Sequence, residues 1–129
     1  METNESSEDY LERILMLEET KGINKVHAVD IALSMGFSKP SVSIALKKLR
    51  IGNLLEVSDR EDLILTPEGR IIAEKIYEKH RVISGLLKMI GVEKETASKD
   101  ACRIEHVLSD DTYDRLKTLF YKERKKSKQ

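Results

Sequence analysis

The sequence predicts a mostly α-helical fold, with an N-terminal winged helix-turn-helix domain at residues 1–70 and an α-helical domain at residues 71–129. Charged residues make up 36% of the 129-residue chain and aromatic residues 5%, a composition that favours helices with charged surfaces. Apolar residues recur at helical spacing along most of the chain, interrupted by two short β-like runs. A chain of this length allows two compact domains at most.

The first two predicted helices cover about Ser7–Thr20 and about Val26–Ser34. Gly22 ends the first, because glycine readily adopts the left-handed conformation that stops a helix. The apolar surface comes from eight residues: Leu11, Ile14, Leu15, Leu17, Val29, Ile31, Ala32 and Leu33. The glycine-containing segment Met35–Ser38 then turns the chain.

A third helix is expected to begin at Ser38-Lys39-Pro40, where the Ser38 hydroxyl can accept a backbone N–H and proline is tolerated. Its core-facing stripe consists of Val42, Ala45, Leu46 and Leu49. The opposite face carries Ser41, Ile44, Lys47 and Lys48. Two short helices joined by such a turn, the second with a small and basic outer face, predict a helix-turn-helix.

Two β-like runs follow, Leu54–Val57 and Leu63–Leu65, separated by the polar stretch 58–62. This pattern predicts a β-hairpin. A hairpin directly after a helix-turn-helix is a wing, whose tip can lie along a phosphate backbone.

The remainder of the chain is predicted to be helical. Thr66 caps a long helix that starts with Pro67 and ends at Gly91. Its apolar stripe consists of Ile71, Ile72, Ile76, Ile83, Leu86, Leu87 and Ile90. Two helices follow, about Lys94–Leu108 and about Asp110–Tyr121, with too little apolar surface for a stable monomeric domain. A homodimer, which would bury this surface, is therefore expected. The basic residues 122–129 are expected to form a disordered tail.

Charge, hydropathy and cysteine content narrow the class of protein. The net charge is zero, yet residues 36–60 carry a net charge of +3, which fits a nucleic-acid-binding face. No segment has the roughly 20 apolar residues of a membrane span, and the acidic start is unlike a signal peptide. A cytoplasmic location is expected. The single cysteine cannot form an internal disulfide, so it either binds metal or is inert.

A thiol, a carboxylate and an imidazole stand at i, i+3 and i+4 in Cys102, Glu105 and His106. If the segment is helical, these side chains share one face and suit a divalent transition metal. Asp9 and Glu12 form a second pair of oxygen donors one turn apart. Each cluster alone is also what an ordinary polar helix face would carry.

Five blocks in order make the chain resemble the metal-dependent repressors of the diphtheria toxin repressor and manganese transport regulator family. The blocks are Glu8-Asp9-Tyr10-Leu11-Glu12, Ser38-Lys39-Pro40-Ser41-Val42-Ser43, Leu65-Thr66-Pro67-Glu68-Gly69, Lys79-His80-Arg81, and the run 100–110 around Cys102. The sequence resembles the short form that lacks a C-terminal β-barrel domain.

The resemblance implies a homodimer that binds operator DNA when Mn(II) or Fe(II) is bound, and so represses metal-uptake genes. The residues that match the primary metal site are Asp9, Cys102, Glu105 and His106. Those that match a second, nearby site are Glu12 and His80. The residues that match the DNA-binding positions are Ser38, Lys39, Pro40, Ser41, Ser43, Ile44 and Lys48. Ile44 faces outward and could contact a thymine methyl or be a tolerated exposed residue.

The metal ligands form a hybrid of two branches of the family. Asp9 is similar to the manganese-sensing branch, whereas Cys102 is similar to the iron-sensing branch. Hard carboxylates suit Mn(II), and a thiolate favours Fe(II), Co(II) and Zn(II). Affinity alone would favour the later metals, so the physiological metal depends on geometry and on supply; we expect Mn(II), with Fe(II) close behind. Ser84 and Ser98 replace residues that would form the iron branch's ancillary site, so that site is expected to be absent.

Two other functions fit parts of the sequence. A winged-helix regulator answering a small organic ligand would use Cys102, Glu105 and His106 only as a helix face. A small metal-dependent hydrolase would need a general base beside a substrate cleft, which the clusters do not supply. The chain is therefore not expected to be an enzyme.

Overall fold

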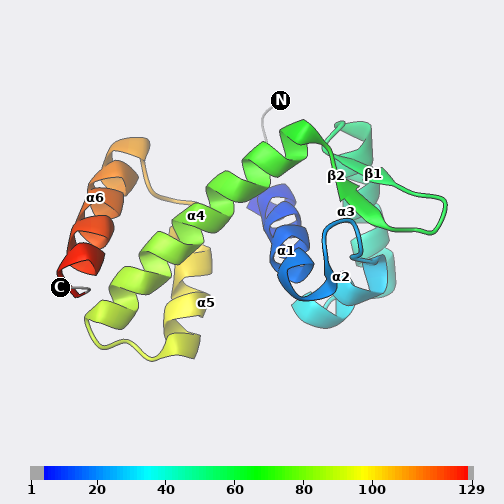
Figure 1. The fold of residues 1–129 in the computed structure, drawn as a ribbon. Coiled ribbons are helices and arrows are strands. Elements are labelled where there is room, and N and C mark those ends of the chain that lie inside the picture. Colours follow the sequence, from blue (N-terminus) through cyan, green and yellow to red (C-terminus); the bar gives the residue numbers. More distant parts are fainter. Residues whose placement is uncertain (1–4, 128–129) are drawn as a thin grey trace. The chain divides into compact units, whose positions relative to one another are not determined.

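The computed structural model describes residues 5–127. Within them the chain forms six helices and two strands, so the mostly helical fold class is confirmed (Figure 1). The chain divides into two units, Met1–Tyr77 and Glu78–Gln129, and the boundary falls inside the long helix α4 (Pro67–Met89). Residues 1–4 of the predicted domain 1–70, and residues 128–129 of the predicted domain 71–129, lie outside the described residues.

The first unit contains the predicted winged helix-turn-helix. Its elements are α1 (Glu5–Lys21), α2 (Ala28–Met35), α3 (Lys39–Ile51), β1 (Leu55–Val57), β2 (Leu63–Leu65) and the first part of α4. Gly36 ends α2 with a φ of 70°, a left-handed conformation that costs glycine little. Ser38 is the N-cap of α3, and its Oγ accepts the Ser41 amide at 3.3 Å. Two local signals therefore set the turn between the helices.

The wing is an antiparallel hairpin in which Leu55 pairs with Leu65 and Val57 with Leu63. Val26 forms an isolated bridge with Leu63, so the prediction that Val26 starts the second helix is wrong. The Leu63 amide donates to the Val26 carbonyl at 2.8 Å, and the Val26 side chain is fully buried. A buried β-branched residue suits a bridge, and α2 begins two residues later.

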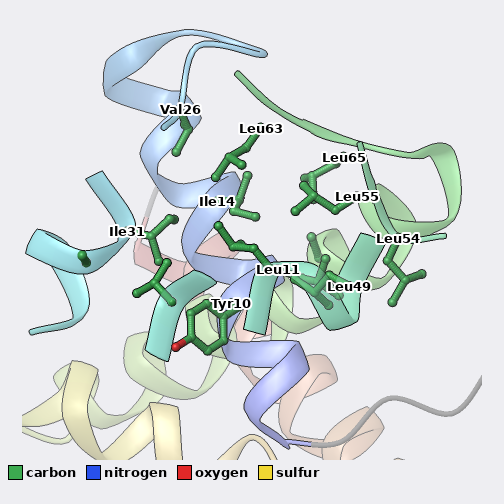
Figure 2. Packing of buried hydrophobic residues seen from close by; sticks show 14 residues of the cluster. Tyr10, Leu11, Ile14, Val26, Ile31, Leu49, Leu54, Leu55, Leu63 and Leu65 are labelled. Atoms are coloured by element: carbon green, nitrogen blue, oxygen red, sulfur yellow. The ribbon is translucent and has the colours of Figure 1, made fainter. Parts of the chain in front are cut away.

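One hydrophobic core holds the first unit together, and Figure 2 shows its side chains converging from α1, α2, α3 and both strands. On α3, the buried residues Val42, Leu46 and Leu49 confirm most of the predicted stripe, and Ala45 is half-buried against the same core. Because this face of α3 is buried, the opposite face is exposed to solvent. The core therefore decides which side of α3 is available for binding.

A salt bridge also connects α1 to the first part of α4. Arg70 donates from Nη1 and Nη2 to the two carboxylate oxygens of Glu18, at 3.0 and 3.1 Å. The Glu18 side chain is 4% exposed, and its Oε2 also accepts the Asn24 amide at 3.2 Å. A two-pronged arginine–carboxylate pair fixes direction as well as distance. It therefore holds the C-terminal half of α1 against α4.

The motif that opens α4 is tightly packed against the segment before the wing. Thr66 Oγ1 donates to the Asn53 carbonyl at 2.8 Å and accepts the Gly69 amide at 3.0 Å, so the predicted cap is confirmed. A Cβ atom at Gly69 would overlap the carbonyl oxygen of Leu54. Only glycine fits this approach of two backbones.

The second unit consists of the rest of α4, α5 (Lys94–Ile104) and α6 (Asp110–Ser127). Val82, Tyr113 and Phe120 form its apolar core. The Tyr113 hydroxyl donates to Glu78 Oε1 at 3.0 Å, and burial followed by this contact raises the pKa of Tyr113. Lys117 Nζ lies 2.7 Å from the same Glu78 oxygen. Apolar and polar contacts therefore both fix α6 against α4.

The C-terminal helices differ from the prediction at two ends. The helix α5 ends at Ile104 instead of Leu108, although the Glu105 amide still donates to the Ala101 carbonyl at 2.9 Å. Residues 122–127, expected to be disordered, continue α6. No glycine or proline interrupts α6, and buried Phe120 anchors its second half.

Four residues of the predicted apolar helix surfaces are exposed to solvent. Val29 and Leu33 on α2 are 45% and 78% exposed, and Ile71 and Ile90 are 58% and 78% exposed. On α2 the buried face is Ile31 and Ala32 alone. Ile90 follows the end of α4, and Ile71 lies off the face that α4 buries.

Among residues 5–127, none of the helices combines the length and the apolar character that crossing a membrane requires.

Candidate metal centre and nucleic-acid interface

Three side chains of the second unit bring together a nitrogen, a sulfur and an oxygen donor. His80 Nδ1 on α4 lies 3.3 Å from Glu105 Oε2 and 3.7 Å from Cys102 Sγ on α5. One donor atom from each residue lies within 4.8 Å of the others. His80 is 6% exposed and Glu105 1%, so the donors converge away from bulk water.

His106 contacts the same carboxylate through its other oxygen. His106 Nε2 lies 3.5 Å from Glu105 Oε1, and the His106 side chain is 3% exposed. Glu105 therefore stands between two imidazoles, with one oxygen facing each. Because α5 ends at Ile104, Glu105 and His106 lie in the turn after the helix, and the expected single helical face is wrong for this pair.

The cluster is arranged differently from the sequence-based division into two sites. The family resemblance implies one site that contains Cys102 and His106, and a separate site that contains His80. In the structure Cys102 groups with His80 and Glu105, whereas His106 groups with Glu105. Glu105 is the residue common to both groups, so it is the centre of the arrangement.

Ser98 contacts the second ring nitrogen of His80, a role that the sequence analysis does not assign. Its Oγ lies 3.3 Å from His80 Nε2. With Nδ1 facing the donor cluster, an Nε2–H can donate to the serine oxygen, which selects one tautomer and one ring orientation. The i, i+4 spacing of Ser98 and Cys102 on α5 is the sequence signal that relates them.

The donor set fits a divalent transition metal ion. Imidazole nitrogen, thiol sulfur and carboxylate oxygen are ligand types that bind Mn(II), Fe(II), Co(II) and Zn(II) with different preferences. Burial of Glu105 is costly for its charge unless positive charge compensates it. The His80, Cys102, Glu105 and His106 side chains therefore have the chemistry and the spacing of a cation site.

The other two candidate ligands, Asp9 and Glu12, lie one turn apart on α1 in the first unit. Glu12 is 3% exposed and Asp9 is half-buried. The same helix carries Leu11 and Ile14, which are buried in the core of the first unit.

The candidate nucleic-acid interface is the outer face of α3. Its predicted residues are all exposed: Ser38, Lys39, Pro40, Ser41, Ser43, Ile44 and Lys48. Ser38 Oγ lies 2.9 Å from Ser41 Oγ, so the start of α3 presents two ordered hydroxyls. Ile44 is 60% exposed, as expected for a residue off the core stripe.

Two further cations lie beside this face. Lys47 and Arg50 are exposed and line a groove shared by α2, α3 and the wing, together with His27 and Val57. Both belong to the basic segment 36–60 and lie three residues apart on the outward side of α3, but neither is among the predicted DNA-binding residues. They extend the basic surface from α3 toward the wing.

Comparison with known proteins identifies the family. The family model "Iron dependent repressor, N-terminal DNA binding domain" matches residues 2–63, and "Iron dependent repressor, metal binding and dimerisation domain" matches residues 66–125. The HTH-type transcriptional regulator MntR of Bacillus pumilus (strain SAFR-032) is 37% identical over 117 residues, which cover 91% of this chain and 80% of the relative.

Solved structures agree in fold. The manganese regulator SloR superposes with a TM-score of 0.76 at 32% identity, over 94% of this chain and 55% of that one. IdeR of T. acidophilum gives a TM-score of 0.77 at 30% identity, over 93% of this chain and 55% of that one. The chain spans about half the length of these solved relatives. These matches do not favour the alternative raised from the sequence, a winged-helix regulator that responds to a small organic ligand. The chain belongs to the iron dependent repressor family of metal-dependent transcriptional repressors.

Proposed function

We propose that this chain represses metal-uptake genes by binding operator DNA as a homodimer when Mn(II) or Fe(II) is bound. The observation that carries the proposal is the cluster of His80, Cys102, Glu105 and His106, in which Cys102 is partly buried and the other three side chains are almost fully buried. The same chain carries a winged helix with an exposed basic face. Neither feature alone distinguishes a metal-responsive regulator from other winged-helix proteins.

The proposed ligands are His80, Cys102, Glu105 and His106 of the second unit, joined by Asp9 and Glu12 of α1. The family resemblance supports the two α1 residues. A bound divalent cation would supply positive charge that compensates the carboxylates. Without it, the like charges of Asp9, Glu12 and Glu105 disfavour any arrangement that gathers them. The chain then samples many arrangements, of which only some suit an operator.

The proposed metal is Mn(II), with Fe(II) as the close second. SloR is named as a manganese regulator, and the matching family models are named for iron. Carboxylate oxygens suit Mn(II), whereas the Cys102 sulfur raises the affinity for Fe(II), Co(II) and Zn(II) relative to Mn(II). The physiological metal then depends on site geometry and on which metal the cell supplies.

For DNA, we propose that α3 enters the major groove. Lys39 and Lys48 contact phosphates, Ser38, Ser41 and Ser43 donate hydrogen bonds, and Ile44 meets a thymine methyl. Dimerisation through the second unit would place two recognition helices on two half-sites. Apolar side chains available for that interface line a groove between α4 and α6: Leu86, Leu87, Met89, Ile90, Leu116 and Leu119.

The test is a DNA-binding titration of the unchanged chain and of His106→Ala, each with Mn(II) and with chelator. DNA fragments are selected from a random pool in the presence of Mn(II). The unchanged chain should bind only with metal, and His106→Ala should lose this response while its circular dichroism and dimer mass are unchanged. Metal counting is done on the same proteins, and for that count alone His27→Ala is the matched control, because the His27 side chain is exposed on the first unit. Metal-dependent binding that persists in His106→Ala would refute the site.

A further inference from the structure

The turn at the tip of the wing is closed by one serine. Ser58 Oγ accepts the amides of Arg60 and Asp62, at 3.2 and 3.0 Å, and donates to Asp62 Oδ2 at 3.1 Å. The Glu61 amide donates to the Ser58 carbonyl at 2.9 Å. These bonds fix the shape of the turn 58–62 but not its direction relative to the helices. The second carboxylate oxygen of Asp62 is left for a partner outside the turn.

That partner is His27, the N-cap residue of α2. His27 Nε2 lies 2.8 Å from Asp62 Oδ1, and the His27 amide donates to Asp30 Oδ2 at 2.9 Å. The backbone of α2 thus holds His27 in place while its ring reaches the wing. The preceding residue, Val26, accepts the Leu63 amide through its carbonyl at 2.8 Å. Val26 and His27, the two residues before α2, are therefore hydrogen-bonded to Leu63 and Asp62 of the wing.

The charges around this contact favour an ionised Asp62 that accepts from an Nε2–H. The hydrogen bond from His27 is the main reason that the pKa of Asp62 lies below its usual value, and Lys25 adds a smaller effect of the same sign. On the other side of the ring, Asp30 is paired with Lys21 at 3.3 Å. A hydrogen bond to a carboxylate is stronger than one between neutral groups.

His27 also lines the groove that the wing shares with α3. Its neighbours there include Lys47 and Arg50 of α3, and Val57 and Glu61 of the wing. The direction of the wing relative to α2 therefore determines how far Arg60 at the tip lies from the cations of α3. A duplex that contacts both elements requires them at a fixed separation.

We propose that His27 is a positioning residue for DNA binding: through Asp62 it holds the wing in the direction in which Arg60 and α3 can engage one duplex. The inference rests on the proposed DNA binding. Without the contact, the wing must be ordered when DNA binds, which weakens affinity. One charge-assisted hydrogen bond corresponds to about a tenfold loss of affinity.

The experiment compares His27→Ala, Asp62→Ala and the double variant in the DNA titration with Mn(II). Each single variant should bind about tenfold more weakly, and the double variant should be no worse than either single one. The Asp62 result is decisive, because removing an acidic residue beside DNA would strengthen binding if only charge mattered. Asp59→Ala is the matched control: it removes the same charge from an exposed position of the same turn and should not weaken binding.

Two further measurements separate positioning from other roles. His27→Gln keeps a donor and should recover part of the lost affinity. Hydrogen exchange of the free protein should be faster in the wing turn of His27→Ala, with metal affinity unchanged. Stronger or equal binding by Asp62→Ala, or equal binding by His27→Ala, would overturn the proposal. If the unchanged chain bound no DNA with metal present, the proposed function would fail and this inference with it.

Discussion

Ser98 Oγ lies 3.3 Å from Nε2 of His80, while the other nitrogen of that ring faces Glu105. The hydrogen bond fixes which His80 nitrogen faces Cys102 and Glu105 in the proposed metal site. Ser98→Ala should therefore weaken metal binding by about tenfold, at the low end for partners that orient a ligand. Competition with a metallochromic chelator measures the affinity. Ser98→Thr keeps the hydroxyl and should bind nearly as tightly as the unchanged chain; equal affinity in Ser98→Ala would contradict the role.

Cys102 should bind through sulfur when the site is loaded with Co(II). A thiolate ligand gives Co(II) a charge-transfer band in the near ultraviolet, and Cys102→Ser should lose it. The same change should narrow the preference for Zn(II) and Co(II) over Mn(II), since the soft donor is removed. Absorption spectra and competitive metal titrations check both effects. An unchanged spectrum would show that the thiol stays outside the coordination sphere.

Lys48 is expected to contact a phosphate, so Lys48→Ala should weaken binding to all DNA sequences by a similar factor. The slope of log affinity against log salt should become shallower by about one unit. Fluorescence anisotropy at several salt concentrations measures this slope. Lys88→Ala changes the same residue type at an exposed position of the second unit and serves as the control. A loss restricted to certain base pairs would instead indicate base recognition by Lys48.

Breaking the Glu18–Arg70 pair should destabilise the first unit. The Glu18 side chain is 4% exposed and that of Arg70 29%, so Glu18→Gln leaves a partly buried cation without its counter-charge. A loss of about 2 kcal/mol in the free energy of unfolding is expected. Urea unfolding followed by circular dichroism measures it. If Arg70→Met in the Glu18→Gln background recovers no stability, the uncompensated charge is not the cause.

The contact between α4 and α6 should make stability depend on pH. Lys117, followed by Tyr113, holds the pKa of Glu78 below its usual value in the folded state. Stability from this group is present above the unfolded-state pKa of about 4.5 and is lost as the pH falls through the lower folded-state pKa. Glu78→Gln should thus be less stable than the parent at neutral pH, with the gap closing below about pH 4. A gap of constant size from pH 7 to pH 3 would contradict this.

Elements with local signals could be predicted from the sequence. Ser38 before Pro40 marks the start of α3, and Thr66 before Pro67 marks the start of α4, because capping depends on residues a few positions apart. The bridge from Val26 to Leu63 could not be predicted, since it joins residues far apart in the sequence. The end of α5 at Ile104 could not be predicted because no glycine or proline marks it. The types of candidate metal ligand could be predicted, because Cys102, Glu105 and His106 are close together in the sequence. The pairing of Cys102 with His80 could not, because it depends on how α4 packs against α5.

The Thr66–Gly69 motif bears on how sequences of this kind are interpreted. Thr66 binds the Asn53 carbonyl, and Gly69 lies where any side chain would strike the carbonyl of Leu54. In a library of all single substitutions, Gly69 should tolerate none, although the residue has no part in the proposed metal or DNA contacts. Intolerance to substitution at such a position reports on architecture, so a motif that identifies a family need not identify the residues that perform its function.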